Sequence, residues 1–279
     1  MGPCVRRDDI PVAGVLRALL TAMLLACLAA PALAEENLYR AQTIVTGTGE
    51  ANRIIGFATC LEDVLIKVSG QLRLAGDKRL APFKAGAARF VRDFSYRDEK
   101  GGKPKNDEQG TRDRSFVLTA EFDDAAVNGI LAKLGAKPWL SRRPTLAVFA
   151  ELNPGARRLV VSADAKDAEL QRAALIAAAA RRGMPIVLPD AADLAGLDSP
   201  GQQLAAIAPA ALSGIASRRG GEVVLTARLV WDDQALRWNS AWQLDGKDRA
   251  QRWRGAAVTY DEAFRQGLGA AAQILSLKQ

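Results

Sequence analysis

The 279-residue sequence contains no histidine. A Ser-His-Asp triad, a Cys-His catalytic pair and a metal site with histidine ligands are therefore excluded. Carboxylates, arginines, tryptophans and three cysteines remain as the groups that could perform chemistry or recognition.

Acidic pairs could supply the acid and the base of a hydrolase that acts on an envelope polymer. Glycan hydrolysis needs only two carboxyl groups on either side of a cleft. The same residues also fit ordinary structural roles at a helix start, after a strand or in a turn. The pairs are Glu62-Asp63, Asp123-Asp124, Asp190 with Asp193, and Asp232-Asp233. We assign no catalytic residue, and a hydrolase remains an alternative.

Four of the five tryptophans fall in the last part of the chain. They are Trp231, Trp238, Trp242 and Trp253. Trp238 and Trp242 are four residues apart on one expected strand and therefore share a face. An exposed row of indoles could anchor a protein partner or stack on sugar rings. A cluster packed beneath the final helix is the other interpretation, and exposure distinguishes the two.

Arginine pairs provide a second set of candidate binding residues. Two pairs, Arg181-Arg182 and Arg218-Arg219, precede glycines that end helices, where cations favour the helix dipole. The other candidates are Arg142, Arg143, Arg157 and Arg158, which flank the first strand of the second half. They could meet an anionic lipid, a glycan or an acidic partner.

Cofactor motifs are incomplete. Gly47-Thr48-Gly49 follows an expected strand, but Asn52 stands where a dinucleotide fingerprint has its third glycine. The Lys-Ser/Thr of a phosphate loop and the spacing of a calcium loop are also missing. We therefore expect no cofactor-binding and no metal-binding residue.

The amino terminus has the parts of a secretory signal peptide. Arg6, Arg7 and Arg17 precede or open an apolar run, and small residues end it before the predicted cleavage site after Ala34. The alternative is a lipoprotein anchored through Cys27, because Leu24-Leu25-Ala26-Cys27 fits a lipobox. The sequence predicts a periplasmic protein with no transmembrane span after cleavage.

Cleavage would leave Cys60 as the only thiol and would exclude an intramolecular disulfide. Cys60 lies on an apolar helix face, which predicts a buried small hydrophobic residue. The formal net charge of +7 is spread along the chain. It favours anionic surfaces and does not indicate a nucleic acid.

Apolar periodicity predicts an α/β (α+β) chain of two domains, each a mixed sheet with helices packed on it. The expected domains are residues 35–140 and 141–279, after a signal peptide of residues 1–34. A rigid segment with two prolines, residues 137–144, marks the boundary. The second domain has the order β-α-β-α-β-β-β-α, and its last strands form a meander.

Several short segments together resemble a bacterial exported family known only as domain of unknown function 2066. The segments are Leu38-Tyr39-Arg40-Ala41, residues 65–70, 122–128 and 139–144, and the run Gly183-Met184-Pro185-Ile186-Val187-Leu188-Pro189. The order of elements in the second domain is similar to that of the amino-terminal domain of the periplasmic protein TolB. The resemblance implies a non-catalytic role in envelope assembly or maintenance, but carries over no catalytic residue.

We therefore expect a non-catalytic binding or adaptor protein of the cell envelope. Its expected partner is another envelope protein or an anionic envelope surface, and no nucleic acid. Two alternatives stay open at this point: the carboxylate-dependent hydrolase, and a carrier of a small anionic ligand. A deep pocket with two carboxyl groups of raised pKa would favour the enzyme, and a closed cavity would favour the carrier.

Overall fold

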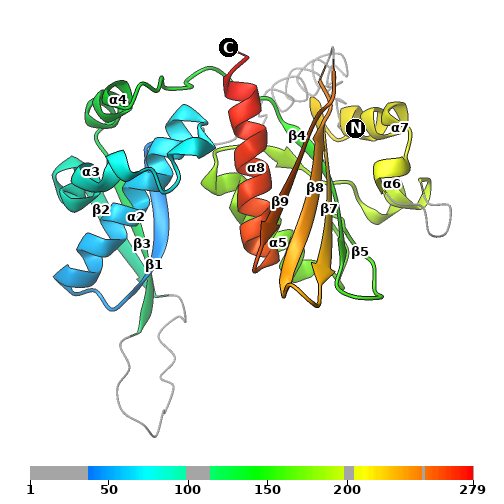
Figure 1. Ribbon diagram of the computed structural model, residues 1–279, viewed down its shortest axis with the longest axis horizontal. Helices are drawn as coiled ribbons and strands as arrows, with labels where there is room; N and C mark the ends of the chain where they lie inside the picture. The colour runs from blue at the N-terminus through cyan, green and yellow to red at the C-terminus, as the bar shows by residue number, and fades with distance from the viewer. Residues whose placement is uncertain (1–36, 99–113, 198–203, 247–248, 279) are drawn as a thin grey trace, which may run out of the picture. The chain divides into compact units, whose positions relative to one another are not determined.

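The computed structural model describes residues 37–98, 114–197, 204–246 and 249–278 (Figure 1). The predicted leader, with its cleavage site after Ala34 and the alternative lipidation site at Cys27, lies outside these residues. In the described part of the chain, no helix combines the length and the apolar composition that a membrane span requires.

An antiparallel sheet of three strands forms the first part of the fold. Its order is β1-β3-β2, so β3 is central and pairs with both neighbours. Side chains alternate along β3, and Leu118, Ala120 and Phe122 face the core. The strands are β1 (Arg40–Thr46), β2 (Val91–Asp98) and β3 (Ser115–Phe122).

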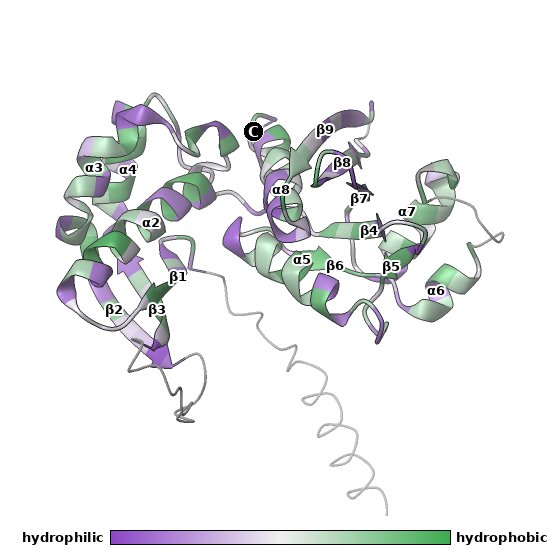
Figure 2. Cartoon of the chain, turned by 60° about the horizontal axis from the view of Figure 1, so that its bottom comes forward, coloured by the Kyte–Doolittle hydropathy of each residue, from purple (hydrophilic) through white to green (hydrophobic). Residues whose placement is uncertain are grey.

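The long helix α2 (Glu50–Ser69) covers this sheet. Leu61, Leu65 and Val68 recur at helical spacing and are fully buried, so they form the stripe that faces the strands. Hydrophobic and hydrophilic colours both occur along α2 in Figure 2. Gly70 ends the helix with φ +69°, and a side chain there would approach the ring of Trp139 to 2.8 Å. The smaller helical segments are η1 (Leu72–Leu74), η2 (Lys78–Leu80), α3 (Ala81–Ala85), η3 (Ala87–Phe90) and α4 (Asp124–Lys133).

The second sheet is mixed. Its order is β5-β4-β7-β8-β9, with β6 paired to β4 off this path. β4 is parallel to β6 and β7, and the other pairings are antiparallel. The strands are β4 (Leu146–Asn153), β5 (Leu159–Val161), β6 (Ile186–Val187), β7 (Val223–Asp232), β8 (Arg237–Leu244) and β9 (Gln251–Ala257).

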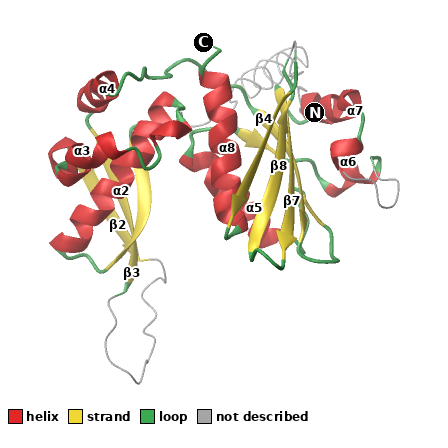
Figure 3. Ribbon diagram, in the orientation of Figure 1, coloured by secondary structure: helices red, strands yellow, loops and turns green. Residues whose placement is uncertain are grey.

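Helices cover both faces of this sheet at β4 and β7 (Figure 3). Along β4, Val148 and Leu152 pack with α5 and α8, whereas Phe149 packs on the opposite face with Leu212 and Ile215 of α7. The helical segments are α5 (Glu169–Arg181), α6 (Ala191–Ala195), η4 (Leu204–Ala206), α7 (Pro209–Arg218) and α8 (Tyr260–Ser276).

The predicted α+β fold class is confirmed, and so is the order of the main elements in the second half. The first sheet is antiparallel throughout, so only the second is mixed. Residues 38–279 cluster into one compact unit. The predicted domain boundary between residues 140 and 141 stays a prediction.

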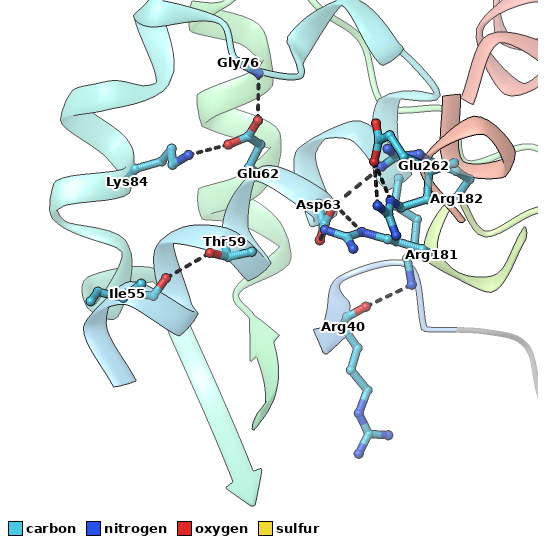
Figure 4. A network of polar contacts seen from close by, with 12 residues as sticks. Arg40, Ile55, Thr59, Glu62, Asp63, Gly76, Lys84, Arg181, Arg182 and Glu262 are labelled. Carbon is cyan, nitrogen blue, oxygen red and sulfur yellow. Dashed lines mark hydrogen bonds and ion pairs between the residues drawn. The ribbon is translucent and has the colours of Figure 1, made fainter. Parts of the chain in front are cut away.

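A buried polar seam connects α2 to α5 (Figure 4). Oδ1 of Asp63 accepts a hydrogen bond from Nε of Arg181 at 2.8 Å and lies 3.4 Å from Nη1 of Arg182. Burial lowers the pKa of Arg182, and the carboxylate of Asp63 opposes that shift. The seam therefore depends on Asp63, because a buried guanidinium without a counter-charge is strongly destabilising.

Arg143, one of the predicted binding residues, belongs to the same connection. Its side chain is only 9% exposed. Its guanidinium donates to the carbonyl oxygens of Arg182 at 2.8 Å and Lys67 at 2.6 Å, and lies 4.4 Å from the ring centroid of Trp139. Arg143 therefore ties the segments around α2 and α5 together, and it is not available on the surface.

Candidate binding surface

Strands β7, β8 and β9 form one end of the second sheet, and their side chains alternate between two faces. α8 packs on one face, in contact with β8 and β9. On the other face, α7 packs against β7. Ala241 and Ala256 are exposed there. Over β8 and β9 this second face is therefore open in the described part of the chain.

The four candidate tryptophans all lie on the face that α8 covers. Trp242 is 3% exposed, and its ring centroid is 6.5 Å from that of Phe264 on α8. Trp238 is also buried. Trp231 and Trp253 are half-buried and pair with Trp238 and Trp242 at 5.6 and 6.2 Å between ring centroids. The structure thus places the indoles in a cluster beneath the final helix, and they form no exposed row.

Four arginines lie on the opposite, open face, which we call the arginine face. The register puts Arg228, Ala241 and Arg254 in one row across the three strands. Arg254 is exposed and makes no hydrogen bond or ion pair with any described residue. An exposed arginine without a counter-ion adds to the positive surface potential. The arginine face consists of Arg228, Arg237, Arg252 and Arg254.

Polar side chains hold parts of this face in place. Arg252 Nε donates to Oε1 of Gln243 at 2.7 Å, and Gln243 Nε2 donates to Oδ1 of Asp245 at 2.8 Å. At the other end of the strands, Asn239 Nδ2 donates to Oδ2 of Asp232 at 3.2 Å. The amides therefore sit between the charged groups, where they can offer further hydrogen bonds to a ligand.

Glu151 marks the border between the arginine face and the core. Its side chain is 1% exposed. One carboxylate oxygen accepts from Nε of Arg158 at 3.1 Å and from the backbone N–H of Leu204 at 3.2 Å, and the other lies 3.2 Å from Nε of Arg228. One buried acid thus holds two arginines. The group as a whole remains positive.

The remaining predicted arginines lie elsewhere. Arg142 donates two hydrogen bonds of 2.8 Å to Glu222, and both residues are exposed. Arg157 lies 3.4 Å from Asp167, also on the surface. Exposed pairs of this kind contribute about 0 to 1 kcal/mol and need no ligand to explain them. Of the four, only Arg158 adjoins the arginine face.

The acidic pairs are held by structural partners. Among the described carboxyl groups, every clear pKa shift is downward. The backbone N–H of Asp193 and the guanidinium of Arg219 lower the pKa of Asp190. Burial alone would raise the pKa of Glu62. Hydrogen bonds from Lys84 and from the amide of Gly76 outweigh the effect of burial, so the pKa of Glu62 is lowered (Figure 4). A general acid at neutral pH needs the opposite shift, so these groups do not support the hydrolase.

Asp123 and Asp232 have local roles of the same kind. Asp123 caps α4 by accepting from the backbone N–H of Ala126. Asp232 accepts from the backbone N–H groups of Ala235 and Gln234 in the turn after β7, and the bond from Ala235 is the main cause of its lowered pKa. These carboxylates therefore stabilise a helix start and a turn.

Cys60 is fully buried on α2. Burial raises the pKa of its thiol to about 12, and the nearby carboxylate of Asp63 adds to the increase. A thiol with so high a pKa is not a nucleophile at neutral pH. The placement agrees with the interpretation of Cys60 as a packing residue.

A hollow of about 370 Å³ lies beside the start of β7. Its lining includes Glu222, Asp245 and Lys278, so it offers two carboxylates against one amine. This charge balance does not favour an anionic ligand. Among the described residues, no group of three or more cysteine, histidine, aspartate or glutamate side chains could hold a metal ion. That the purified chain carries no metal stays a prediction.

Comparison with known families corrects the resemblance drawn from short segments. The family model that matches is a different one, Domain of unknown function (DUF8605), over residues 32–140. The assignment to domain of unknown function 2066 is therefore wrong. No curated protein matches the chain. The matched region contains the first sheet and α2, and the arginine face lies beyond it. The similarity is to a domain of unknown function, so it indicates no activity for residues 32–140.

Arg228, Arg237, Arg252 and Arg254 were not among the predicted binding residues, although the sequence carries a signal for them. Arg252 and Arg254 flank Trp253 at period two, so they must point away from the face that receives the indole. Arg228 and Arg237 have the same phase relative to Leu229 and Trp238. Arginines adjacent to core residues on consecutive strands therefore predict this set.

Proposed function

We propose that this chain is an exported, non-catalytic binding protein of the cell envelope, and that it binds an acidic protein partner through the arginine face. The observation that carries the proposal is the group of arginines on the open side of the sheet. Arg237, Arg252 and Arg254 are exposed there, and Arg254 has no counter-ion among the described residues. The signal-peptide pattern of residues 1–34 supports export.

The chemistry of the face favours a carboxylate-rich partner. A guanidinium presents a planar set of donors that matches a carboxylate in two parallel hydrogen bonds. Gln243 and Asn239, between the arginines, add neutral donors and acceptors. A charged surface of this composition favours specificity and a fast association rate, both of which depend on ionic strength.

The absence of aromatic side chains from the face argues against single-stranded nucleic acid. Sheet surfaces that bind such strands stack the bases on aromatic rings. In β7 to β9, the described tryptophans all lie on the α8 side. An acidic protein therefore fits the face better than a nucleic acid does.

The test is site-specific photo-crosslinking in intact cells. A photoreactive residue replaces Ala241, which is exposed in the centre of the face, and in the control it replaces Leu170, which is 72% exposed on α5. We expect an adduct with an acidic protein at position 241 only, and we expect it to disappear when Arg252→Glu and Arg254→Glu are added. Purified partner should then bind the parent chain in a salt-dependent manner.

Three outcomes would contradict the proposal. Equal adducts at both positions would show that the contact is non-specific. An adduct unaffected by the charge reversals would show that the arginines do not recognise the partner. Adducts with lipid alone would favour an anionic membrane surface in place of a protein.

A further inference from the structure

β9 is an edge strand, and its outward backbone groups can be assigned. The backbone N–H of Asp245 donates to the carbonyl of Val224, which fixes the hydrogen-bonded pairs between β7 and β8. Because hydrogen-bonded and non-hydrogen-bonded residues alternate in an antiparallel ladder, even-numbered residues of β8 bond to β9. The N–H and C=O groups of Arg252, Arg254 and Ala256 therefore point away from β8, and no described strand pairs with them.

The two sides of this free edge differ in chemistry. On the α8 side, a hollow of about 360 Å³ is lined by Leu72, Trp253, Ala270 and Ile274, together with Arg73 and Gln273. The indole Nε1 of Trp253 is buried and has no hydrogen-bond partner among the described residues. On the other side lie the guanidinium groups of the arginine face. One side is thus mainly apolar, and the other is positive.

We infer that β9 pairs with an extended segment of the partner, in which acidic and apolar residues alternate. An added strand turns successive side chains to opposite faces of the sheet. Its acidic residues would meet Arg252 and Arg254, and its apolar residues would lie over the hollow beside Trp253. The inference rests on the proposed function, because it specifies how the partner meets the same arginines.

A second copy of this chain is a poorer occupant of the edge. Pairing of β9 with β9 would bring the side chains of Arg252 and Arg254 from both copies onto one small area. Like charges that face each other across strands are destabilising, and charged side chains on an edge strand commonly prevent self-association. Charge complementarity therefore selects an acidic segment from another protein.

The experiment measures binding of labelled peptides to the full exported chain by fluorescence anisotropy. The probe is a peptide of about ten residues with alternating glutamate and valine, which is long enough to cover a strand. Two control peptides have the same composition in blocks, or lysine in place of glutamate. We expect saturable binding of the alternating peptide, at least about tenfold weaker binding of the blocked peptide, and no binding of the lysine peptide.

Two substitutions at one position test the backbone pairing. Ala256→Pro removes an outward N–H without removing a bond to β8, and proline is tolerated on the free side of an edge strand. Ala256→Val keeps the N–H and is the matched control. We expect Ala256→Pro to weaken binding about tenfold, as the loss of a backbone hydrogen bond implies, and Ala256→Val to leave it unchanged. Circular dichroism confirms that both variants fold.

The outcomes separate the two proposals. If Ala256→Pro and Ala256→Val bind equally well, edge pairing is refuted. If binding in that case still requires Arg252 and Arg254, the proposed function survives without edge pairing. If the charge reversals also have no effect, both proposals fail. Slower amide hydrogen exchange at Arg254 and Ala256 in the complex would support pairing at the edge.

Discussion

The two faces of β8 use the same backbone for opposite purposes. Trp238 and Trp242 face α8 and are buried, whereas Asn239, Ala241 and Gln243 alternate with them on the open side. The residue types differ accordingly, with large apolar rings on one side and small or polar groups on the other. A shift of one residue along the strand therefore decides whether a side chain faces the core or the open side.

The covered face fits closely against α8, and the open face has no such constraint over β8 and β9. Gly267 on α8 lies against the ring of Trp242, and a Cβ at this position would come within 2.1 Å of that ring. The helix can approach the strand only because this residue has no side chain. On the open side, an enlargement of Ala241 would meet solvent. Substitutions on the covered face should therefore change stability, and substitutions on the open face should change binding.

The largest predicted effect is that of Trp242→Ala on the covered face. Removal of a buried indole loses apolar burial and leaves a cavity under α8. We therefore expect the free energy of unfolding to fall by about 3–5 kcal/mol. Urea denaturation of the purified chain measures this change. Ala241→Ser, the adjacent residue on the open face, should change stability by less than about 0.5 kcal/mol. Equal losses for the two variants would abolish the distinction between the faces.

The elements of this fold could be predicted from sequence because their signals are local. Period-two alternation is visible in the sequence of β3 and of the meander, and Leu61, Leu65 and Val68 recur at helical spacing in α2. The same alternation placed Trp238 and Trp242 on one face, but it could not say which face was covered. That choice depends on where α8 packs, which is a long-range contact.

The roles of individual arginines were harder to predict from the sequence. Arg142, Arg143, Arg157 and Arg158 were grouped because they are neighbours in sequence, yet one is buried against backbone carbonyls and two form surface ion pairs. The partners of Arg143 are up to 76 residues away in the sequence. Charge alone does not reveal such partners, and residue phase on the strands is a better guide to the binding surface.

Glu151→Gln tests the border between the open face and the core. The substitution keeps the shape but leaves Arg158 and Arg228 without their shared counter-charge. Because both guanidinium groups keep some contact with solvent, we expect a loss of about 2 kcal/mol in unfolding free energy. Glu222→Gln, which removes a carboxylate from an exposed pair, should cost less than about 1 kcal/mol. Urea denaturation at neutral pH compares them, and equal losses would count against a buried role for Glu151.

Arg254→Glu should change binding and leave stability almost untouched. The side chain is exposed, so we expect a change in unfolding free energy within about 0.5 kcal/mol. Anisotropy at low ionic strength should show at least about tenfold weaker binding of a labelled polyglutamate peptide. Arg97→Glu on β2 changes the net charge equally and is exposed. If both variants lose the same affinity, the total charge of the protein and not the arginine face attracts the peptide.

The smallest predicted effect concerns Asp232, which ends the open face. The backbone N–H of Ala235 donates to its carboxylate and lowers its pKa below the ordinary value of 3.8. A lowered folded-state pKa stabilises the fold above the unfolded-state value, and the contribution is lost as the pH falls through the folded-state pKa. We therefore expect Asp232→Asn to be slightly less stable than the parent at neutral pH, and the gap to close in acid. Thermal unfolding of both proteins, measured from neutral pH into acid below pH 3.8, checks the direction of this change. A gap that widens in acid would show that Asp232 does not stabilise the turn through its charge.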